Sequence, residues 1–368
     1  MKINKLKITN FKSIDTLTLT SPNNFSIFAG ANGSGKTNIF QALDFVGKIS
    51  HQGLSKTLSE FGGYENVHSY KNKTSSKEAA FFIFEIDVSI EKKTYYYALK
   101  VQIFPETNII EETIKADSDI LFQRNKDGSI SFQSLSSGPM SLPFDSDKSL
   151  LSFLGENDCF KKLISNIKTL RVDPLNAKQP SSSDHDSTTL NEHASNIAAV
   201  LSRILKEKPE IADEILELIT LIVPNLEKIE AQSQKIDNKT GLLFKEKGTA
   251  KQFPAHLISD GTIYALAQII MVLDRKPYSW LLIEEPERGI HPQAIQELIE
   301  LMREEADDSL IWINTHSESV VRVSQAAELL LVDKKNGKTH ITHAKKISPP
   351  LSMSDAWLSN VFKSGLPW

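Results

Sequence analysis

The residues best suited to chemistry begin with a glycine-rich segment near the N-terminus, which matches the pattern GxxxxGK followed by Ser or Thr. Its members are Gly30, Ala31, Asn32, Gly33, Ser34, Gly35, Lys36 and Thr37. In such a loop the backbone N–H groups point at phosphate oxygens, and the following helix N-terminus adds favourable partial charge. We expect Lys36 to reach the β- and γ-phosphates of ATP, Thr37 to bind Mg²⁺ and Asn38 to belong to the same site.

Two consecutive carboxylates follow a second apolar run, residues 280–283. A buried strand that ends in acidic residues is where a phosphate-loop protein holds Mg²⁺ and orients the attacking water. Glu284 would support the metal through water, and Glu285 would act as the base or position the attacking water. Acidic residues also follow strands as helix N-caps or solvated turns, so the upstream glycine-rich loop is what favours the catalytic interpretation.

Three further segments turn a general nucleotide-binding pattern into a specific one. Residues 257–262 open an apolar helix, residues 287–292 follow the carboxylates, and a later strand at residues 310–314 leads to His316. The candidate residues of the first segment are Ser259, Asp260, Gly261 and Thr262. Taken alone, that segment could be a simple helix N-cap and His316 an ordinary loop histidine. The order and spacing of all the motifs favour the functional interpretation.

Together these segments resemble the P-loop, signature, D-loop and switch histidine of ABC-type ATPases. The resemblance is strongest to the RecF, structural-maintenance-of-chromosomes and overcoming-lysogenization-defect branch, and it covers residues 1–47 and 256–333. It implies that the signature of one copy binds the γ-phosphate held by the P-loop of another, with Glu285 and His316 as catalytic residues. A homodimer on ATP, or a higher oligomer, is therefore implied. Lys12 resembles a basic residue that touches phosphates in relatives, although an exposed lysine without a role is an equal alternative.

The sequence departs from the family pattern at two positions. Asp260 stands where the usual signature has a second glycine, which places an acid near a phosphate site. Glu284 replaces the more common aspartate and is one methylene longer. These departures keep open a weakly hydrolysing ATP-binding scaffold. Residues 61–64 occur where a glutamine loop is expected, but we interpret them as a plain turn.

Apolar periodicity indicates the elements that position these motifs. Residues 1–30 predict strands that end directly before the glycine-rich loop, and residues 79–104 predict a hairpin with its turn at Glu91. More short strands are expected up to about residue 135. Residues 194–222 carry apolar positions at helical spacing, interrupted at Pro209.

The expected fold class is α/β, with the ABC-type P-loop core. Its parts are a mixed central sheet flanked by helices, an antiparallel β subdomain and a helical insertion. We expect one ATPase module in three parts. Residues 1–175 form an N-terminal lobe with the P-loop, residues 176–255 a mobile loop and helical lid insertion, and residues 256–368 the signature helix, acidic strand, switch histidine and a final hairpin.

Composition limits the class of protein. The 368 residues are 40% hydrophobic and 24% charged, as in ordinary globular proteins. No apolar run reaches the roughly 18 residues of a membrane span, and the N-terminus lacks a signal-peptide core, so no membrane partner and a cytoplasmic location are expected. The single cysteine excludes an intrachain disulfide framework. A net charge of −4 argues against a surface built for general nucleic-acid binding, yet leaves a local DNA-binding patch open.

The function expected from these patterns is a Mg²⁺-dependent ATPase that acts as a switch or sensor for a separate effector, a nuclease or a toxin, in bacterial anti-phage defence. About 35 residues follow Asp333 and predict a hairpin, so no nuclease domain is expected in this chain. The alternatives are a DNA repair or recombination ATPase that binds DNA when ATP is bound, and the weakly hydrolysing scaffold.

Overall fold

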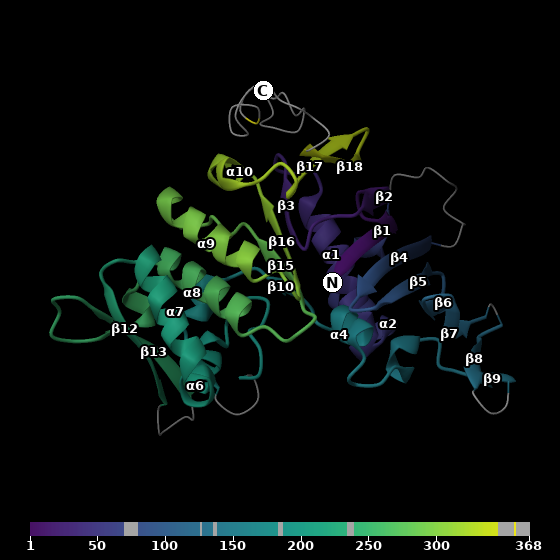
Figure 1. Ribbon diagram of the computed structural model, residues 1–368, viewed down its shortest axis with the longest axis horizontal. Coiled ribbons are helices and arrows are strands. Elements are labelled where there is room, and N and C mark those ends of the chain that lie inside the picture. Colours follow the sequence, from purple (N-terminus) through teal and green to yellow (C-terminus); the bar gives the residue numbers. More distant parts are fainter. Residues whose placement is uncertain are drawn as a thin grey trace.

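The computed structural model describes residues 1–69, 80–125, 127–134, 138–182, 187–233, 239–344 and residue 357. A six-stranded sheet lies at the centre, between a lobe built from the first half of the chain and a lobe built mainly from the later helices (Figure 1). Among the described helices, none combines the length and the apolar content that a membrane-spanning helix needs.

The central sheet is mixed, as predicted. Its strands, in spatial order, are β10 (Ile167–Leu170), β15 (Trp280–Glu284), β16 (Leu310–Thr315), β3 (Phe25–Ala29), β17 (Leu329–Lys335) and β18 (Lys338–His343). The first five run parallel, and β18 returns antiparallel to β17 as the predicted C-terminal hairpin. Because parallel strands end at one edge, the loops after β3, β15 and β16 lie together there.

Apolar residues alternate along these strands between two cores, so both faces of the sheet are covered. In β15, Leu281 and Ile283 belong to one hydrophobic cluster, and Trp280 and Leu282 belong to the other. A near-continuous apolar run is what a parallel strand buried on both faces requires. The helices are α1 (Lys36–Gln52), α2 (Leu54–Glu60), α3 (Tyr64–Val67), α4 (Cys159–Ser165), α5 (Pro174–Ala177), α6 (Ile197–Glu207), α7 (Pro209–Ile222), α8 (Asp260–Leu273), α9 (Pro292–Glu304) and α10 (Glu318–Val323), with short 3₁₀ turns η1 (Leu150–Phe153) and η2 (Ala255–Leu257).

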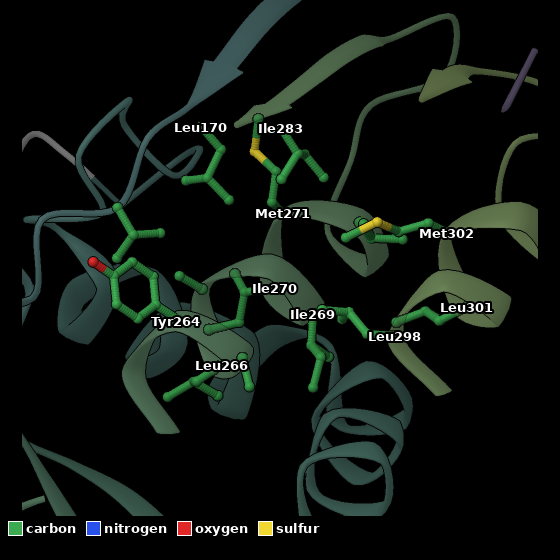
Figure 2. Close-up of a cluster of buried hydrophobic side chains, with 14 of the residues drawn as sticks. Leu170, Tyr264, Leu266, Ile269, Ile270, Met271, Ile283, Leu298, Leu301 and Met302 are labelled. Atoms are coloured by element: carbon green, nitrogen blue, oxygen red, sulfur yellow. The ribbon is translucent and has the colours of Figure 1, made fainter. Parts of the chain in front are cut away.

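Helix α8 is the most deeply buried element of the later lobe, with 12 of its residues buried. Figure 2 shows its side chains between Leu170 and Ile283 on the central sheet and Leu298 and Met302 on α9. Since each fully buried side chain of this size contributes about 1.5–3 kcal/mol, this packing fixes the helix firmly. The start of α8, which carries the predicted signature, is thereby held in place relative to the acidic strand β15.

The N-terminal lobe contains the predicted antiparallel β subdomain, an eight-stranded sheet that continues past residue 135. Its strands, in spatial order, are β2 (Ile14–Thr20), β1 (Lys2–Phe11), β4 (Ala80–Ile90), β5 (Lys93–Phe104), β6 (Asn108–Ala116), β7 (Asp119–Arg124), β8 (Ser129–Ser134) and β9 (Gly138–Pro143). The predicted hairpin is β4–β5, and Glu91 stands in its turn with φ 53°. Helix α1 packs between this sheet and the central one, so the P-loop helix touches both.

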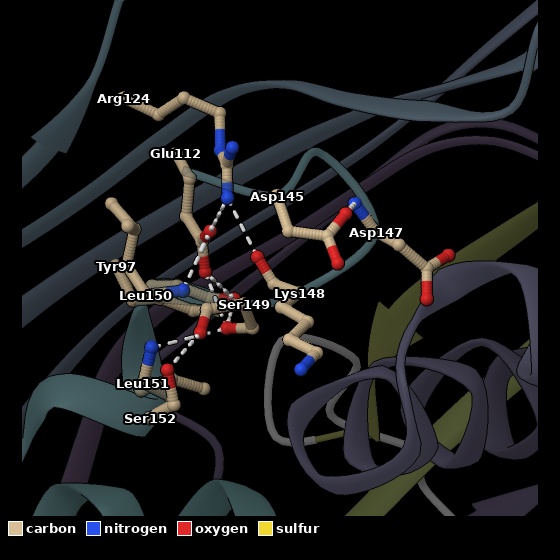
Figure 3. A network of polar contacts seen from close by, with 10 residues as sticks. All are labelled: Tyr97, Glu112, Arg124, Asp145, Asp147, Lys148, Ser149, Leu150, Leu151 and Ser152. Carbon is tan, nitrogen blue, oxygen red and sulfur yellow. Dashed lines mark hydrogen bonds and ion pairs between the residues drawn. The ribbon is translucent and has the colours of Figure 1, made fainter. Parts of the chain in front are cut away.

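A buried polar network lies on one face of this antiparallel sheet (Figure 3). The carboxylate of Glu112 accepts hydrogen bonds from the Tyr97 hydroxyl at 2.9 Å, the Ser149 hydroxyl at 2.5 Å and the Leu150 backbone N–H at 2.9 Å. The guanidinium of Arg124 lies 3.9 Å from the same carboxylate, and both side chains are 0% exposed. The network fastens the segment before η1 to strands β5, β6 and β7.

The insertion differs from the prediction, because it contains strands as well as helices. The helical pair appears as α6 and α7, with Pro209 as the first residue of α7. The prediction did not include the small antiparallel sheet of β11 (Ser181–Ser182), β13 (Lys239–Glu246), β12 (Leu226–Ser233) and β14 (Phe253–Pro254). A register shift between Leu226 and Lys228 interrupts the alternation of β12, which is why its pattern is weak in the sequence. Part of the polar stretch expected to be a mobile loop, residues 183–186, lies outside the described residues.

Candidate nucleotide-binding site

The glycine-rich loop joins β3 to α1 at the carboxyl edge of the central sheet, as predicted. Gly35 precedes the first residue of α1 and has φ 105°, a left-handed value that favours glycine. A Cβ atom at this position would lie 2.0 Å from the Thr339 Oγ1 atom, so no side chain fits. Gly30 follows β3 directly, and Asn32 and Gly33 are exposed at the tip of the loop. The loop therefore presents backbone to solvent at its tip and is closely packed at its base.

Lys36 lies inside the loop. Its ammonium donates hydrogen bonds to the carbonyl oxygens of Gly30 at 2.6 Å and Ala31 at 3.0 Å. Burial lowers the pKa of Lys36, while the nearby carboxylates, first Glu285 and then Glu287, act in the opposite direction. The positive charge thus faces both the loop backbone and the acidic residues that follow β15.

A polar brace behind the loop includes two residues, Ser13 and Thr339, whose role the sequence did not predict. The Thr339 hydroxyl on β18 lies 2.7 Å from the Ser13 hydroxyl and donates to the Ser34 carbonyl at 3.2 Å. The Asn38 amide donates to Ser13 Oγ at 2.6 Å. These contacts join α1, the turn after β1 and the final hairpin. No spacing rule could reveal them, because Ser13 and Thr339 are 326 positions apart.

The acidic strand ends beside the strand that carries the histidine. Glu284 is in register with Asn314 on β16. Glu285 turns away with φ 49°, and its N–H donates to the Asn314 backbone carbonyl at 3.0 Å and side-chain Oδ1 at 3.2 Å. Its carboxylate lies 3.2 Å from Nδ1 of His316. The structure therefore brings together the two residues expected to be catalytic.

Glu287 also belongs to this group, although the sequence analysis assigned it no role. Its Oε1 atom accepts a hydrogen bond from the Thr315 hydroxyl at 2.7 Å. Burial raises the pKa of Glu287 and that of Glu284. Of the buried side-chain atoms that have no hydrogen-bond partner among the described residues, three lie at this edge: Glu287 Oε2, Asn314 Nδ2 and Ser34 Oγ. Buried polar atoms at a sheet edge with unused hydrogen-bonding capacity fit a site that receives a polar ligand.

The few oxygen donors at this edge suit Mg²⁺ in a nucleotide site better than they suit a metal ion bound only by protein side chains. Within the residues that the structure describes, no cluster of three or more His, Cys, Asp or Glu residues is arranged to hold a metal ion. Mg²⁺ in nucleotide sites is bound by one or two protein oxygens, together with phosphates and water. The Thr37 hydroxyl and the Glu284 carboxylate are donors of that type. Arg171, which follows β10, lies 3.7 Å from Glu284 and was not singled out from the sequence.

The predicted signature forms the beginning of α8. Ser259 is its N-cap: the Oγ atom accepts from the Thr262 N–H at 3.2 Å and lies 2.8 Å from the Thr262 hydroxyl. A Cβ atom on Gly261 would lie 2.1 Å from the Gly289 carbonyl oxygen, so the helix start rests directly on the loop after the carboxylates. The Asp260 carboxylate forms an ion pair with the Lys178 ammonium at 2.5 Å. Among the described residues, no hydrogen bond or ion pair joins this segment to the P-loop of the same chain.

Lys12 does not point into the P-loop in this structure. Its ammonium donates to the Gln41 side chain at 2.7 Å and lies 5.8 and 5.9 Å from the ring centres of Phe11 and Phe61. Burial lowers the pKa of Lys12. Residues 61–64 form the turn between α2 and the start of α3, as predicted. Lys12 thus packs against this turn and α1.

The family described as "AAA domain, putative AbiEii toxin, Type IV TA system" matches residues 25–322. The chain belongs to this family. The match begins at the first residue of β3 and ends in α10, so it includes the P-loop, signature, acidic strand and His316. Lys12, Ser13 and Thr339 lie outside the matched residues.

Curated relatives are similar over parts of the chain. An uncharacterized protein, MJECL44, of Methanocaldococcus jannaschii is 31% identical over 172 residues, which is 45% of this chain and 48% of that protein. The chromosome partition protein Smc of the same organism is 36% identical over 81 residues, 22% of this chain and 7% of that protein. The matched regions therefore cover less than half of either relative.

The fold has a counterpart among solved structures. An Smc head bound to the C-winged helix domain of ScpA is similar with a TM-score of 0.60 and 16% identity, covering 93% of this chain and 97% of that one. At this identity the likeness concerns the fold. Together with the family match, it confirms the predicted ABC-type fold.

Proposed function

We propose that this protein is a Mg²⁺-dependent ATPase that dimerises around ATP and switches a separate effector in bacterial anti-phage defence. One observation carries the proposal. The P-loop lysine, three carboxylates and a histidine meet at one edge of the sheet, while the signature of the same chain makes no polar contact with its own P-loop. An ATP site with a signature would be completed by a second copy.

Each residue of this edge has a distinct role in the proposed reaction. Lys36 exchanges the carbonyl oxygens of Gly30 and Ala31 for phosphate oxygens, because an ammonium bonds more strongly to an anion than to a neutral acceptor. Glu285 accepts the proton of the attacking water, and its 3.2 Å contact with His316 Nδ1 fixes the direction of the carboxylate. Asn314 holds the backbone of Glu285.

The metal side of the site involves Thr37 and Glu284. Mg²⁺ bound there would neutralise negative charge that develops on the phosphates. Arg171 and Lys36 both lie within electrostatic reach of Glu284 and favour its charged form, although burial dominates and raises the pKa of this carboxyl. Partial burial of Glu284, 9% exposed, limits competition from bulk water for its oxygens.

The effector is proposed on more general grounds. The family description names a putative toxin of a TA system, which supports a place in defence. The Smc head in the similar structure is bound to a separate protein domain, which supports the idea that a head of this fold presents a docking surface. Co-purification of a distinct protein under ATP would support the effector, whereas DNA binding that depends on ATP and salt would favour the repair alternative.

The catalytic part of the proposal is tested by ATP binding and phosphate release in two variants. Lys36→Ala should abolish ATP binding, since it removes the buried ammonium. Glu285→Gln should bind ATP but release phosphate at least about 100-fold more slowly, the usual contribution of a general base. Lys335→Ala is the control, because that side chain is 64% exposed. Turnover at the wild-type rate in Glu285→Gln would contradict the role of this residue.

A further inference from the structure

Asp260 is an unusual residue to find where a phosphate is expected. It is the first residue of α8, directly after the Ser259 N-cap, and its side chain is 63% exposed. The N-terminus of a helix attracts anions through its unpaired N–H groups and partial positive charge. A carboxylate at this point cancels that attraction and repels a second anion. By itself, this helix start is therefore poorly suited to receive the terminal phosphate of ATP.

The positive charge of Lys178 offsets the negative charge of Asp260. Its ammonium lies 2.5 Å from the Asp260 carboxylate, and its side chain is only 13% exposed. The residue is the C-cap of α5, where its backbone N–H bonds to the Pro174 carbonyl at 3.1 Å. Helix α5 packs against α8. The lysine is thus ordered before any ligand arrives, and its charge is directed at Asp260.

The helix start itself has little freedom to retreat from a ligand. Gly261 lies against the Gly289 carbonyl, with no room for even one extra carbon atom. The Arg288 guanidinium lies 5.6 Å from the Tyr264 ring one turn further along α8. Asp260 therefore stays at the surface, and its charge is balanced in place by the lysine.

We propose that Lys178 enables the Asp260-bearing start of α8 to accept the terminal phosphate of a nucleotide bound to a second copy of the chain. The proposal rests on the dimer of the proposed function and deepens it. With Lys178 paired, the carboxylate and ammonium charges cancel and the N–H groups of α8 remain attractive to an anion. Lys178 is a positioning residue, since it acts through Asp260.

The test uses the full-length Glu285→Gln protein, in which hydrolysis is slowed, and measures the ATP concentration for half-maximal dimer formation by light scattering. Adding Lys178→Met should raise that concentration about tenfold, because the uncompensated Asp260 charge faces the phosphate. Adding Asp260→Asn to the Lys178→Met protein should restore it, because the repelling charge is then gone. ADP, which lacks the terminal phosphate, should show no dependence on Lys178.

A matched control distinguishes this effect from the loss of any surface ion pair. Lys228 pairs with Glu230 at 2.5 Å on β12, and Lys228→Met should leave dimer formation unchanged. Unchanged dimer formation in Lys178→Met, or a defect that Asp260→Asn does not repair, would overturn the proposal while leaving the proposed function intact. If the Glu285→Gln protein does not dimerise with ATP at all, the proposed function and this proposal both fail.

Discussion

At the scale of single residues, the candidate site uses backbone conformations that side-chain patterns do not predict. Glu285 has φ 49°, a value that costs a non-glycine residue on the order of 1 kcal/mol or more. The strain at Glu285 is offset by two hydrogen bonds from its N–H to Asn314. Because the backbone turns at Glu285, its carboxylate reaches His316. The sequence identified both residues from motif order, but it could not identify the contact between them.

The hydroxyl of Thr339 offers a test of the brace behind the P-loop. Thr339→Val keeps the shape of the side chain but removes the contacts with Ser13 Oγ and the Ser34 carbonyl. ATP binding should weaken about fivefold, because a lost hydrogen bond costs about 1 kcal/mol. Calorimetric titration with ATP measures the effect. Thr342→Val on the same strand is the control, since Thr342 is exposed. Equal affinities for ATP in the two variants would contradict a role of the Thr339 contacts in ATP binding.

At the scale of elements, regular apolar patterns predicted several helices and strands, although β13 was missed despite the alternation of its buried residues. The period of 3.6 residues in α1 and α8 and the alternation of β4 and β5 predicted these elements correctly. Strand β12 was missed because its bulge breaks the alternation. The contact between Gly261 and Gly289 could not be predicted either, because it depends on how α8 packs on the loop after β15.

The buried network on β5, β6 and β7 gives the antiparallel sheet a dependence on pH. Burial raises the pKa of Glu112 in the folded protein. The folded state therefore keeps this proton to higher pH than the unfolded chain. The contribution of the carboxyl to stability is full below the unfolded pKa and is lost as pH rises through the folded pKa.

We therefore predict how Glu112→Gln compares with the wild type, because glutamine cannot titrate. The free energy of unfolding of the wild type minus that of the variant should fall as pH rises from about 4 to about 8, by roughly 1.4 kcal/mol for each unit of pKa shift. Urea unfolding across this range measures it. Glu111→Gln is the control, because its exposed pair with Lys100 contributes little. A difference that stays constant or grows with pH would contradict the assignment.

At the scale of the whole molecule, the candidate site is open on one side. The side chains of Glu285 and His316 are 39% and 43% exposed, which is high for a site that must hold one attacking water and exclude bulk water during phosphoryl transfer. The motif order in the sequence predicted the parts of this site and implied the second copy through family resemblance. It could not indicate that Lys178 balances Asp260, since these residues are 82 positions apart and meet only in the fold.

The most direct test of ATP-dependent dimerisation is the mass of the Glu285→Gln protein in solution, measured by light scattering with and without ATP and Mg²⁺. We expect monomers without nucleotide and dimers, or multiples of dimers, with ATP. The same measurement on Lys36→Ala should show no change with ATP, because its P-loop lacks the lysine. A mass of Glu285→Gln that is the same in both conditions would contradict the claim that two copies close around ATP.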